Sequence, residues 1–259
     1  MLKKRLIAVV TVRNGWAVQS FGYRRYLPLG KPECLVENLN RWGADEILVQ
    51  VIDRNIADQE PDFDLLARLG GLGLETPLIY AGGISSVAHA VRAIQLGADR
   101  VSLDWALHRA PDEVRRMSDR LGAQALIAAV PVHFGGGVMR YDYLTRTSVP
   151  FGDIVPTLIS DRVVSELMLI DWQNDGGKAG FVPERLAELP CTDAPLILFG
   201  GVTDPTLTRR FLEQPSVAAV AVGNLFSYRE HAYQAYKREV SSDAMRPPVY
   251  ADACLAEEL

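Results

Sequence analysis

The sequence is poor in the residues that would cross-link a chain or hold a metal ion. Its 259 residues include 3 cysteines and 4 histidines. Cys34, Cys191 and Cys254 are far apart, and an odd, scattered set fits neither a disulfide framework nor a zinc-site spacing. No histidine lies at ligand spacing from a cysteine or a carboxylate. We therefore predict free thiols, no metal and no cofactor, in a cytoplasmic protein.

Excess positive charge and long apolar runs are also absent. The 27 Lys and Arg residues against 32 Asp and Glu residues give a net charge of -5, which argues against nucleic acid as a partner. No apolar run approaches the ~20 residues of a membrane helix. The basic start Met1–Arg5 and the apolar run Leu6–Val12 resemble a short signal peptide. Because polar residues follow at once, a buried first strand is the better interpretation.

Short apolar runs instead alternate with longer amphipathic stretches, which is typical of βαβ units. The predicted strands are Arg5–Val12, Glu46–Ile52, Pro77–Ala81, Arg100–Leu103, Ala125–Pro131, Glu166–Asp171, Pro195–Phe199 and Ala218–Val222. The clearest predicted helices are Pro32–Trp42, Phe63–Gly70, Val87–Leu96 and Pro111–Leu121. Without an internal linker, this pattern predicts an α/β fold, a single (βα)8 TIM barrel over residues 1–240. A polar C-terminal tail is expected at 241–259, outside the barrel.

The two halves of the chain resemble each other. The segment Thr76–Ile84 matches Ala194–Val202, and Asp45–Leu48 matches Ser165–Met168 at nearly the same offset. We therefore expect two half-barrels of common design, with similar sites facing each other across the mouth. The glycines and alternating apolar residues of Val132–Pro150 further predict a small hairpin after the fifth strand.

Glycines at strand ends make candidate phosphate sites, because a residue without Cβ lets the backbone approach an anion. The candidate phosphate-binding residues are Gly82, Gly83, Gly200, Gly201, Gly223 and Asn224. The last four follow strands seven and eight, where barrels commonly bind phosphate. In the other half, Asp104 would repel a phosphate. The alternative is that these glycines only turn the chain.

Four charges occupy the starts of strands one, two, four and six: Arg5, Glu46, Arg100 and Glu166. The starts of parallel strands meet at one end of a barrel, so these side chains could converge on its floor and pair there. The alternative is that strand starts are wet and often charged. The alternation of sign on alternating strands favours convergence.

The loop Asp171–Gly180 after the sixth strand combines carboxylates, an amide and glycines at the expected catalytic mouth. Asp175 in this loop is the candidate catalytic acid or base. The alternative is a solvated Asn-Asp-Gly-Gly turn. Asp53–Asn55 is a weaker candidate of the same kind, and His133 is of interest because it lies just after a strand.

Several segments together resemble the cyclase subunit family of imidazole glycerol phosphate synthase, over nearly the whole chain up to about Tyr236. The matching segments are Met1–Ile7, Gly43–Glu46, Gly82–Ile84, Gly97–Ser102, Asp175–Gly180 and Phe226–Glu230. The resemblance implies a glutaminase docked on the floor, and ammonia passing through the barrel to a phosphorylated small molecule at the mouth. The four floor charges match the family's gate, with Arg100 in place of the usual Lys. Asp45 and Asp99 match positions near the docking face.

The mouth departs from this family. Its two catalytic aspartates match Thr11 and Pro131, a further aspartate matches Val51, and a lysine matches Gln19. Threonine and proline offer no group that titrates near neutrality, so they cannot replace carboxylates in proton transfer. The resemblance therefore implies an intact floor beneath an altered mouth.

Three functions remain open. The first is an ammonia-conducting subunit of a glutamine amidotransferase complex, because diverged members of the family are associated with amidation of surface-polysaccharide sugars. The second is the cyclase subunit of histidine biosynthesis, with Asp175 and other residues transferring protons. The third is a non-catalytic barrel that binds a phosphorylated ligand or a partner. The first needs the floor charges and a glutaminase, the second needs carboxylates at the mouth, and the third needs neither.

Overall fold

Eight parallel strands close into a barrel in this computed structural model, which describes residues 3–54, 59–142, 145–177, 180, 182–190, 194–227 and 230–248. Their order is β1-β4-β5-β6-β7-β10-β11-β12, with β10 paired to β7 and β12 paired to β1. The barrel strands are β1 Arg5–Arg13, β4 Glu46–Val51, β5 Leu78–Ala81, β6 Arg100–Leu103, β7 Leu126–Phe134, β10 Glu166–Asp171, β11 Leu196–Phe199 and β12 Val217–Val222. The predicted (βα)8 barrel is confirmed.

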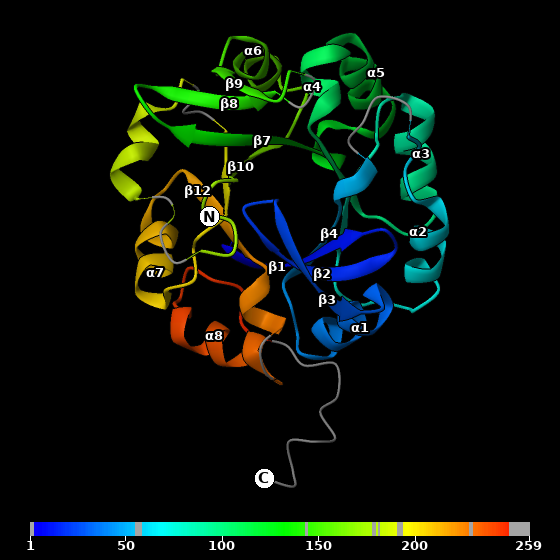
Figure 1. Ribbon diagram of the computed structural model, residues 1–259, viewed down its shortest axis with the longest axis vertical. Helices are drawn as coiled ribbons and strands as arrows, with labels where there is room; N and C mark the ends of the chain where they lie inside the picture. Colours follow the sequence, from blue (N-terminus) through cyan, green and yellow to red (C-terminus); the bar gives the residue numbers. More distant parts are fainter. Residues whose placement is uncertain are drawn as a thin grey trace, which may run out of the picture.

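Helices surround this barrel as an outer ring (Figure 1). They are α1 Pro32–Arg41, α2 Phe63–Gly70, α3 Val87–Gln95, α4 Trp105–Arg109, α5 Pro111–Leu121, α6 Ile154–Ser160, α7 Pro205–Glu213 and α8 Ala232–Val240. The short 3₁₀ segments are η1 Ile52–Arg54, η2 Ala123–Ala125, η3 Pro183–Glu188 and η4 Asn224–Ser227. Local chemistry fixes several starts. Pro32 occupies the first turn of α1, and the side chain of Ser86 caps α3 by accepting from the amide of His89.

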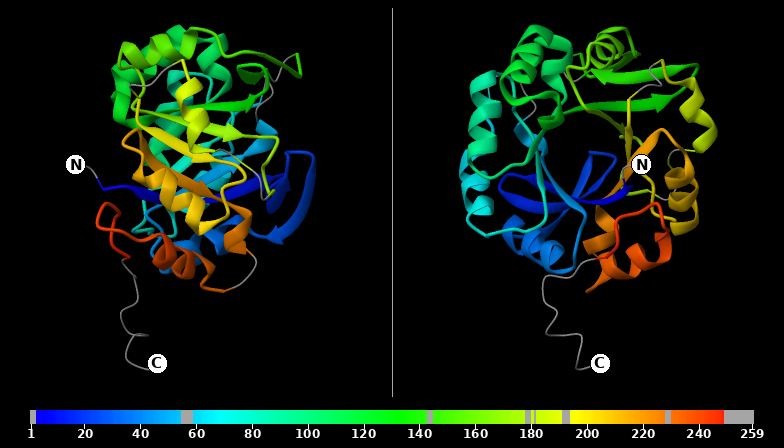
Figure 2. Two further views of the ribbon diagram at one scale, coloured as in Figure 1. Left: turned by 90° about the vertical axis from the view of Figure 1, so that its left-hand side faces the viewer. Right: turned by 180° about the vertical axis from the view of Figure 1, so that it is seen from behind.

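Each half of the barrel carries an antiparallel hairpin beside its first strand. The pair β8 Val138–Asp142 and β9 Thr147–Pro150 confirms the hairpin predicted after the fifth barrel strand. A second pair, β2 Trp16–Phe21 and β3 Arg25–Gly30, follows β1 and was not predicted. Both hairpins project from the end of the barrel opposite the N-terminus (Figure 2). The arrangement repeats between halves, as the sequence match suggested.

Two layers of buried side chains hold this architecture together. One fills the space between the strands and the outer helices. The other fills the barrel itself with Ile7, Val9, Leu48, Ile79, Ala81, Ile127, Ala129, Met168, Ile170, Ile197, Phe199, Ala219 and Ala221. Burial of these apolar side chains stabilises the fold by roughly 25 cal/mol per Å² removed from water. The barrel interior is therefore a dry, apolar column between its two ends.

Residues 241–248 run along the N-terminal end of the barrel, beside the start of β1 (Figure 2). The amide of Lys4 donates to the carbonyl of Ala244 (2.8 Å), and the amide of Arg246 donates to the carbonyl of Lys4 (3.0 Å). Met245 between them is 2% exposed. The division at residue 240 stays a prediction, and residues 249–259 with Cys254, like Cys191, lie outside the described part. Cys34 is an exposed free thiol.

Candidate functional site: a charged floor and a covered mouth

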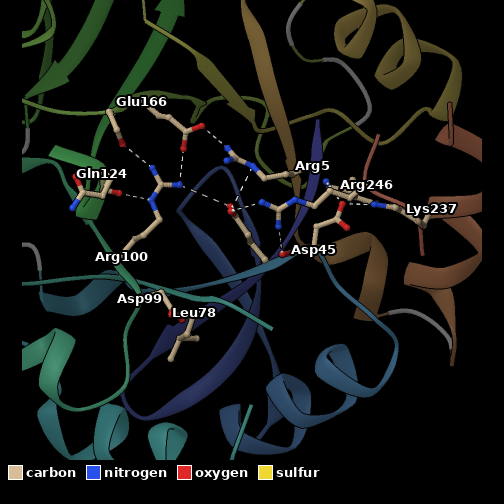
Figure 3. A network of polar contacts seen from close by, with 12 residues as sticks. Arg5, Asp45, Leu78, Asp99, Arg100, Gln124, Glu166, Lys237 and Arg246 are labelled. Atoms are coloured by element: carbon tan, nitrogen blue, oxygen red, sulfur yellow. Dashed lines mark hydrogen bonds and ion pairs between the residues drawn. The ribbon is translucent and has the colours of Figure 1, made fainter. Parts of the chain in front are cut away.

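The four predicted floor residues meet in one ion-pair ring at the N-terminal end of the barrel (Figure 3). Arg5 pairs with Glu166 and with Glu46, and Arg100 pairs with Glu166 through an N–O distance of 2.6 Å. The side chains are 5–14% exposed. Opposite charges in alternating positions offset the cost of taking each group out of water. The ring therefore closes the lower end of the apolar column.

The two carboxylates of this ring are held unequally. Glu166 contacts both arginines closely, whereas Glu46 lies 3.5 Å from Arg5 Nε and 4.0 Å from Arg100 and Arg246. No hydrogen bond to the Glu46 carboxylate exists in the described part of the chain, and its Oε2 is buried. Burial raises the pKa of Glu46 above its usual range, although Arg5 and Arg100 oppose the shift. Glu46 is therefore the loosest member of the ring.

The two aspartates expected near a docking face have structural partners. Asp45 accepts from the amide of Leu6 (2.8 Å) and pairs with Lys237, and both side chains are buried. Asp99 accepts from the amide of Leu78 (2.8 Å) but is otherwise exposed. Asp45 therefore links the start of β1 to α8. Of the two aspartates, only Asp99 is exposed at this face.

At the other end of the barrel, two aromatic side chains cover the apolar column. Tyr23 and Trp172 pack directly on the interior cluster. The hydroxyl of Tyr23 donates to Gln50 Oε1 (3.0 Å), and burial raises the pKa of Tyr23. Trp172 in turn meets the rings of Tyr141 and His133, with centroid distances of 4.8 and 6.4 Å. His133 therefore does lie at the mouth, as part of an aromatic wall.

The hairpin β2–β3 that carries Tyr23 is fixed to two neighbouring loops. The amide of Gly22 donates to the carbonyl of Asp175 (2.8 Å). Asn224 accepts from the amide of Ser20 (3.1 Å) and donates to its carbonyl (2.6 Å). A Cβ added to Gly176 would lie 2.3 Å from the same carbonyl, so this loop fits only with glycine there. The hairpin therefore lies closed over the mouth.

Asp175 is buried beneath this hairpin, and its Oδ2 has no hydrogen-bond partner among the described residues. Burial raises the pKa of Asp175 to about 6, which suits a group that gives and takes a proton near neutral pH. Asp171 accepts from the amide nitrogen of the Asn174 side chain (2.8 Å), and its pKa is also raised by burial. The weaker candidate Asp53 accepts from the amide of Asn14 (2.6 Å) in the turn between β1 and β2, and Asn55 lies outside the described residues.

The candidate phosphate glycines have clear packing roles. A Cβ on Gly82 would lie 2.5 Å from the carbonyl oxygen of Val51, and one on Gly200 would lie 2.4 Å from that of Asp171. Both have left-handed φ angles, as do Gly83 and Gly201 (φ 72° and 68°). In each half-barrel, the backbone after one strand thus lies tightly against the end of the preceding barrel strand. This close approach accounts for the repeated Gly-Gly. Phosphate binding at these positions and at Gly223 stays a prediction, and the Asn224 amide is already engaged by Ser20.

The positions that depart from the resembled family's pattern lie on the barrel strands β1, β4 and β7 and on β2. Thr11, Gln19 and Val51 are buried, and Thr11 pairs with Gln50 across β1 and β4. Pro131 on β7 pairs with Ile170 and faces a small pocket at the mouth. No carboxylate ends β1 or β7 on the inner side.

Several residues at the mouth were missed from the sequence. Tyr23 was missed because the β2–β3 hairpin was missed, although Asn14-Gly15, the tight turn that joins β1 to β2, is a strong signal that β2 follows. Both residues have positive φ angles (50° and 76°), as such a turn requires. No sequence pattern pointed to Arg140 or Trp105, because their proximity depends on how β8 folds back toward α4.

Comparison with known proteins agrees with the barrel fold. The family described as histidine biosynthesis protein matches residues 5–232, and the chain belongs to this family. The Vibrio vulnificus protein named "Putative imidazole glycerol phosphate synthase subunit hisF2" is 27% identical over 244 residues, covering 93% of this chain and 89% of that protein. The imidazole glycerol phosphate synthase subunit HisF of Natranaerobius thermophilus is 25% identical, covering 93% and 97%. The chain is thus a diverged, HisF-like member of the family. Within the described residues, no helix has the length and hydropathy to cross a membrane.

Proposed function

We propose that this protein is the ammonia-conducting subunit of a glutamine-dependent complex. A glutaminase docks on the floor, and ammonia moves through the barrel to an acceptor at the mouth. The observation that carries the proposal is the apolar column, which runs from a ring of ion-paired charges at one end to the mouth beneath Tyr23 and Trp172 at the other. In the resembled family the corresponding charges form the gate for ammonia.

The column suits a neutral passenger. Moving a charged ammonium ion among side chains such as Ile7, Leu48 and Met168 is costly, because none of them can replace its hydration. Neutral ammonia loses far less hydration free energy when it enters the column. The interior would therefore pass ammonia while rejecting ammonium and most water.

Glu46 is the element of the ring most suited to move. Its contacts of 3.5–4.0 Å are too long for hydrogen bonds, whereas Glu166 stays tied to two arginines. Arg246 lies beside Glu46 and is part of the segment 241–248 on the same face. Docking of a glutaminase there would compete for Glu46 and open a path beside it.

A second candidate is the cyclase activity of the histidine pathway. It is favoured by the names of the relatives and by Asp175, whose pKa of about 6 fits an acid or base. It is opposed by Thr11 and Pro131 in place of carboxylates. Sugar amidation at a surface polysaccharide is one form that the first proposal could take.

The test begins with a pull-down from native lysate that identifies the glutaminase and any acceptor enzyme. The recovered complex is then given glutamine labelled with nitrogen-15 in its amide, together with excess unlabelled ammonium. Conduction through the barrel predicts product that carries the label undiluted. Glu46→Ala and Arg5→Ala should allow dilution, while Glu37→Ala on the exposed face of α1 should not. Full dilution in the wild-type complex, or undiluted product in both floor variants, would reject the proposal.

A further inference from the structure

A small pocket opens at the mouth between the end of β6, helix α4 and strand β8. It encloses about 320 Å³ of space, part of it open to solvent, and is lined by Asp104, Trp105, His108, Arg140 and Asp142 among others. The hollow is shallow and partly open, so a ligand would place only one group inside it and leave the rest at the surface. Nothing described above uses these side chains.

Arg140 is the residue that gives the pocket its character. Its side chain is 17% exposed, yet its guanidinium makes no hydrogen bond in the described part of the chain. Its nearest carboxylate oxygen, on Asp142, is 3.8 Å away, because both oxygens of Asp142 already accept from Arg109 (3.3 and 3.1 Å). A guanidinium has five N–H donors that need acceptors when water is removed. The pocket therefore contains a mostly buried guanidinium that has one long ion pair, with Asp142, and N–H groups without an acceptor among the described residues.

A second donor lacks an acceptor at the same place. The indole nitrogen of Trp105 is buried and has no partner among the described residues. His108 beside it stays neutral at pH 7, because burial and the nearby arginines lower its pKa to about 4. The positive charge of the pocket therefore comes from its arginines. Trp105 forms part of the wall, and the donors open to a ligand are those of Arg140.

The nearby acidic groups limit the charge that a ligand can bring. Asp104 and Asp142 line the same pocket, so a doubly charged phosphate would meet two carboxylates. A planar carboxylate carries one charge and matches the two parallel N–H groups of a guanidinium. The aspartates could in turn accept hydrogen bonds from hydroxyl groups on the rest of the ligand.

We propose that this pocket binds a small hydroxylated carboxylic acid in its ionised form, with Arg140 holding the carboxylate through two hydrogen bonds. The site goes beyond the proposed ammonia path and does not depend on it. Only the further idea that the bound ligand accepts ammonia rests on the proposed function. Ala129 lines both the pocket and the apolar column, so a ligand here would lie at the column's upper end.

Calorimetry of the barrel alone, without a glutaminase, tests the site. The probe is D-gluconate, the matched neutral control is sorbitol, and the competing oxyanion is inorganic phosphate. We expect saturable gluconate binding in the millimolar range or tighter, none for sorbitol, and weaker binding of phosphate. Arg140→Gln should weaken gluconate binding about tenfold or more, Arg140→Lys should weaken it less, and the exposed Arg116→Gln should leave it unchanged.

A second measurement holds even if the arginine variants fold poorly. In the wild-type protein, gluconate should shift the indole N–H resonance of Trp105, identified by its loss in Trp105→Phe. No saturable binding of gluconate, equal binding to a well-folded Arg140→Gln, an unmoved Trp105 resonance or tighter binding of phosphate would each overturn the inference. Because no glutaminase is present, these outcomes are independent of the label-dilution test.

Discussion

Two aspartates at the mouth illustrate how burial alone changes the chemistry of a residue. Asp104 and Asp175 come from different halves of the barrel, and burial raises the pKa of each to about 6 from an ordinary value of 3.8. Exposed carboxyls such as that of Asp119 have no comparable burial. The mouth therefore contains two acids that change charge near neutral pH. Neither lies at Thr11 or Pro131, the positions that match the resembled family's catalytic aspartates.

The raised pKa of Asp104 makes a prediction about stability. A carboxyl whose pKa is higher in the folded chain contributes stability that is fully present below pH ~4 and is lost as the pH rises through about 6. Asp104→Asn removes this loss and can still cap α4, where Asp104 now accepts from the amide of Trp105. We expect the variant to be more stable by about 1–2 kcal/mol at pH 8 and not at pH 4.

Urea unfolding of Asp104→Asn and the wild type at several pH values checks this. The exposed substitution Asp119→Asn serves as the control and should give parallel curves. A constant difference between Asp104→Asn and the wild type across pH 4–8 would contradict the explanation.

On the floor, the unequal contacts of the two glutamates predict unequal costs of truncation. Glu166→Ala removes the close partner of both Arg5 and Arg100 and leaves two buried cations, so it should destabilise the fold by about 3 kcal/mol or more. Glu46→Ala removes only longer contacts and relieves a buried acid, so the loss should be about 1 kcal/mol or less. Chemical denaturation measures both. A greater loss in Glu46→Ala would show that the ring is held differently.

At the scale of elements, the strand ends of the two half-barrels depend on glycine for packing. Gly82→Ala and Gly200→Ala would each place a Cβ within 2.5 Å of a carbonyl oxygen at a left-handed φ. We expect each to destabilise the barrel by about 2–4 kcal/mol. Gly223→Ala should cost less than about 1 kcal/mol, because its nearest neighbour would be 3.6 Å away. Thermal unfolding would test the three together, and equal losses would contradict this packing explanation.

The elements that could be predicted are those whose pattern of apolar and polar residues is clear in the sequence. All eight barrel strands were found to within a few residues, because a buried parallel strand is a continuous apolar run between turns. The β2–β3 hairpin was missed because β3 has no buried residue, and because only the two-residue turn Asn14-Gly15 separates β2 from β1. The floor ring was predictable because all four charges occupy equivalent strand starts.

The mouth could be predicted only in part, for a physical reason. Asp175 and His133 were found because they lie directly after strands. The pairing of Trp172 with Tyr141, or of Arg140 with α4, depends on how two loops fold back across the barrel. Such contacts have no period in the sequence, so no sequence pattern predicts them.

For the molecule as a whole, the two ends have opposite designs. The mouth is covered by a hairpin that hydrogen bonds fix to two loops, while the floor is closed by charges and flanked by the segment 241–248. A small molecule that entered from the floor would thus meet the charged ring first, then the apolar column, and then the aromatic side chains of Tyr23 and Trp172. Each end has its own barrier, so the two can be altered separately.

This separation predicts that the C-terminal segment supports the floor rather than the mouth. Met245 lies beside Lys4 just before β1, is 2% exposed and packs in the apolar layer outside the strands, so Met245→Ala should destabilise the fold by about 2–4 kcal/mol through the cavity it leaves. Met139 on β8 is only half-buried, and Met139→Ala should cost about 1 kcal/mol or less. Hydrogen exchange of Met245→Ala should accelerate at the start of β1 and leave the β2–β3 hairpin unchanged. Faster exchange in that hairpin would mean that the floor and the mouth are mechanically coupled through the barrel.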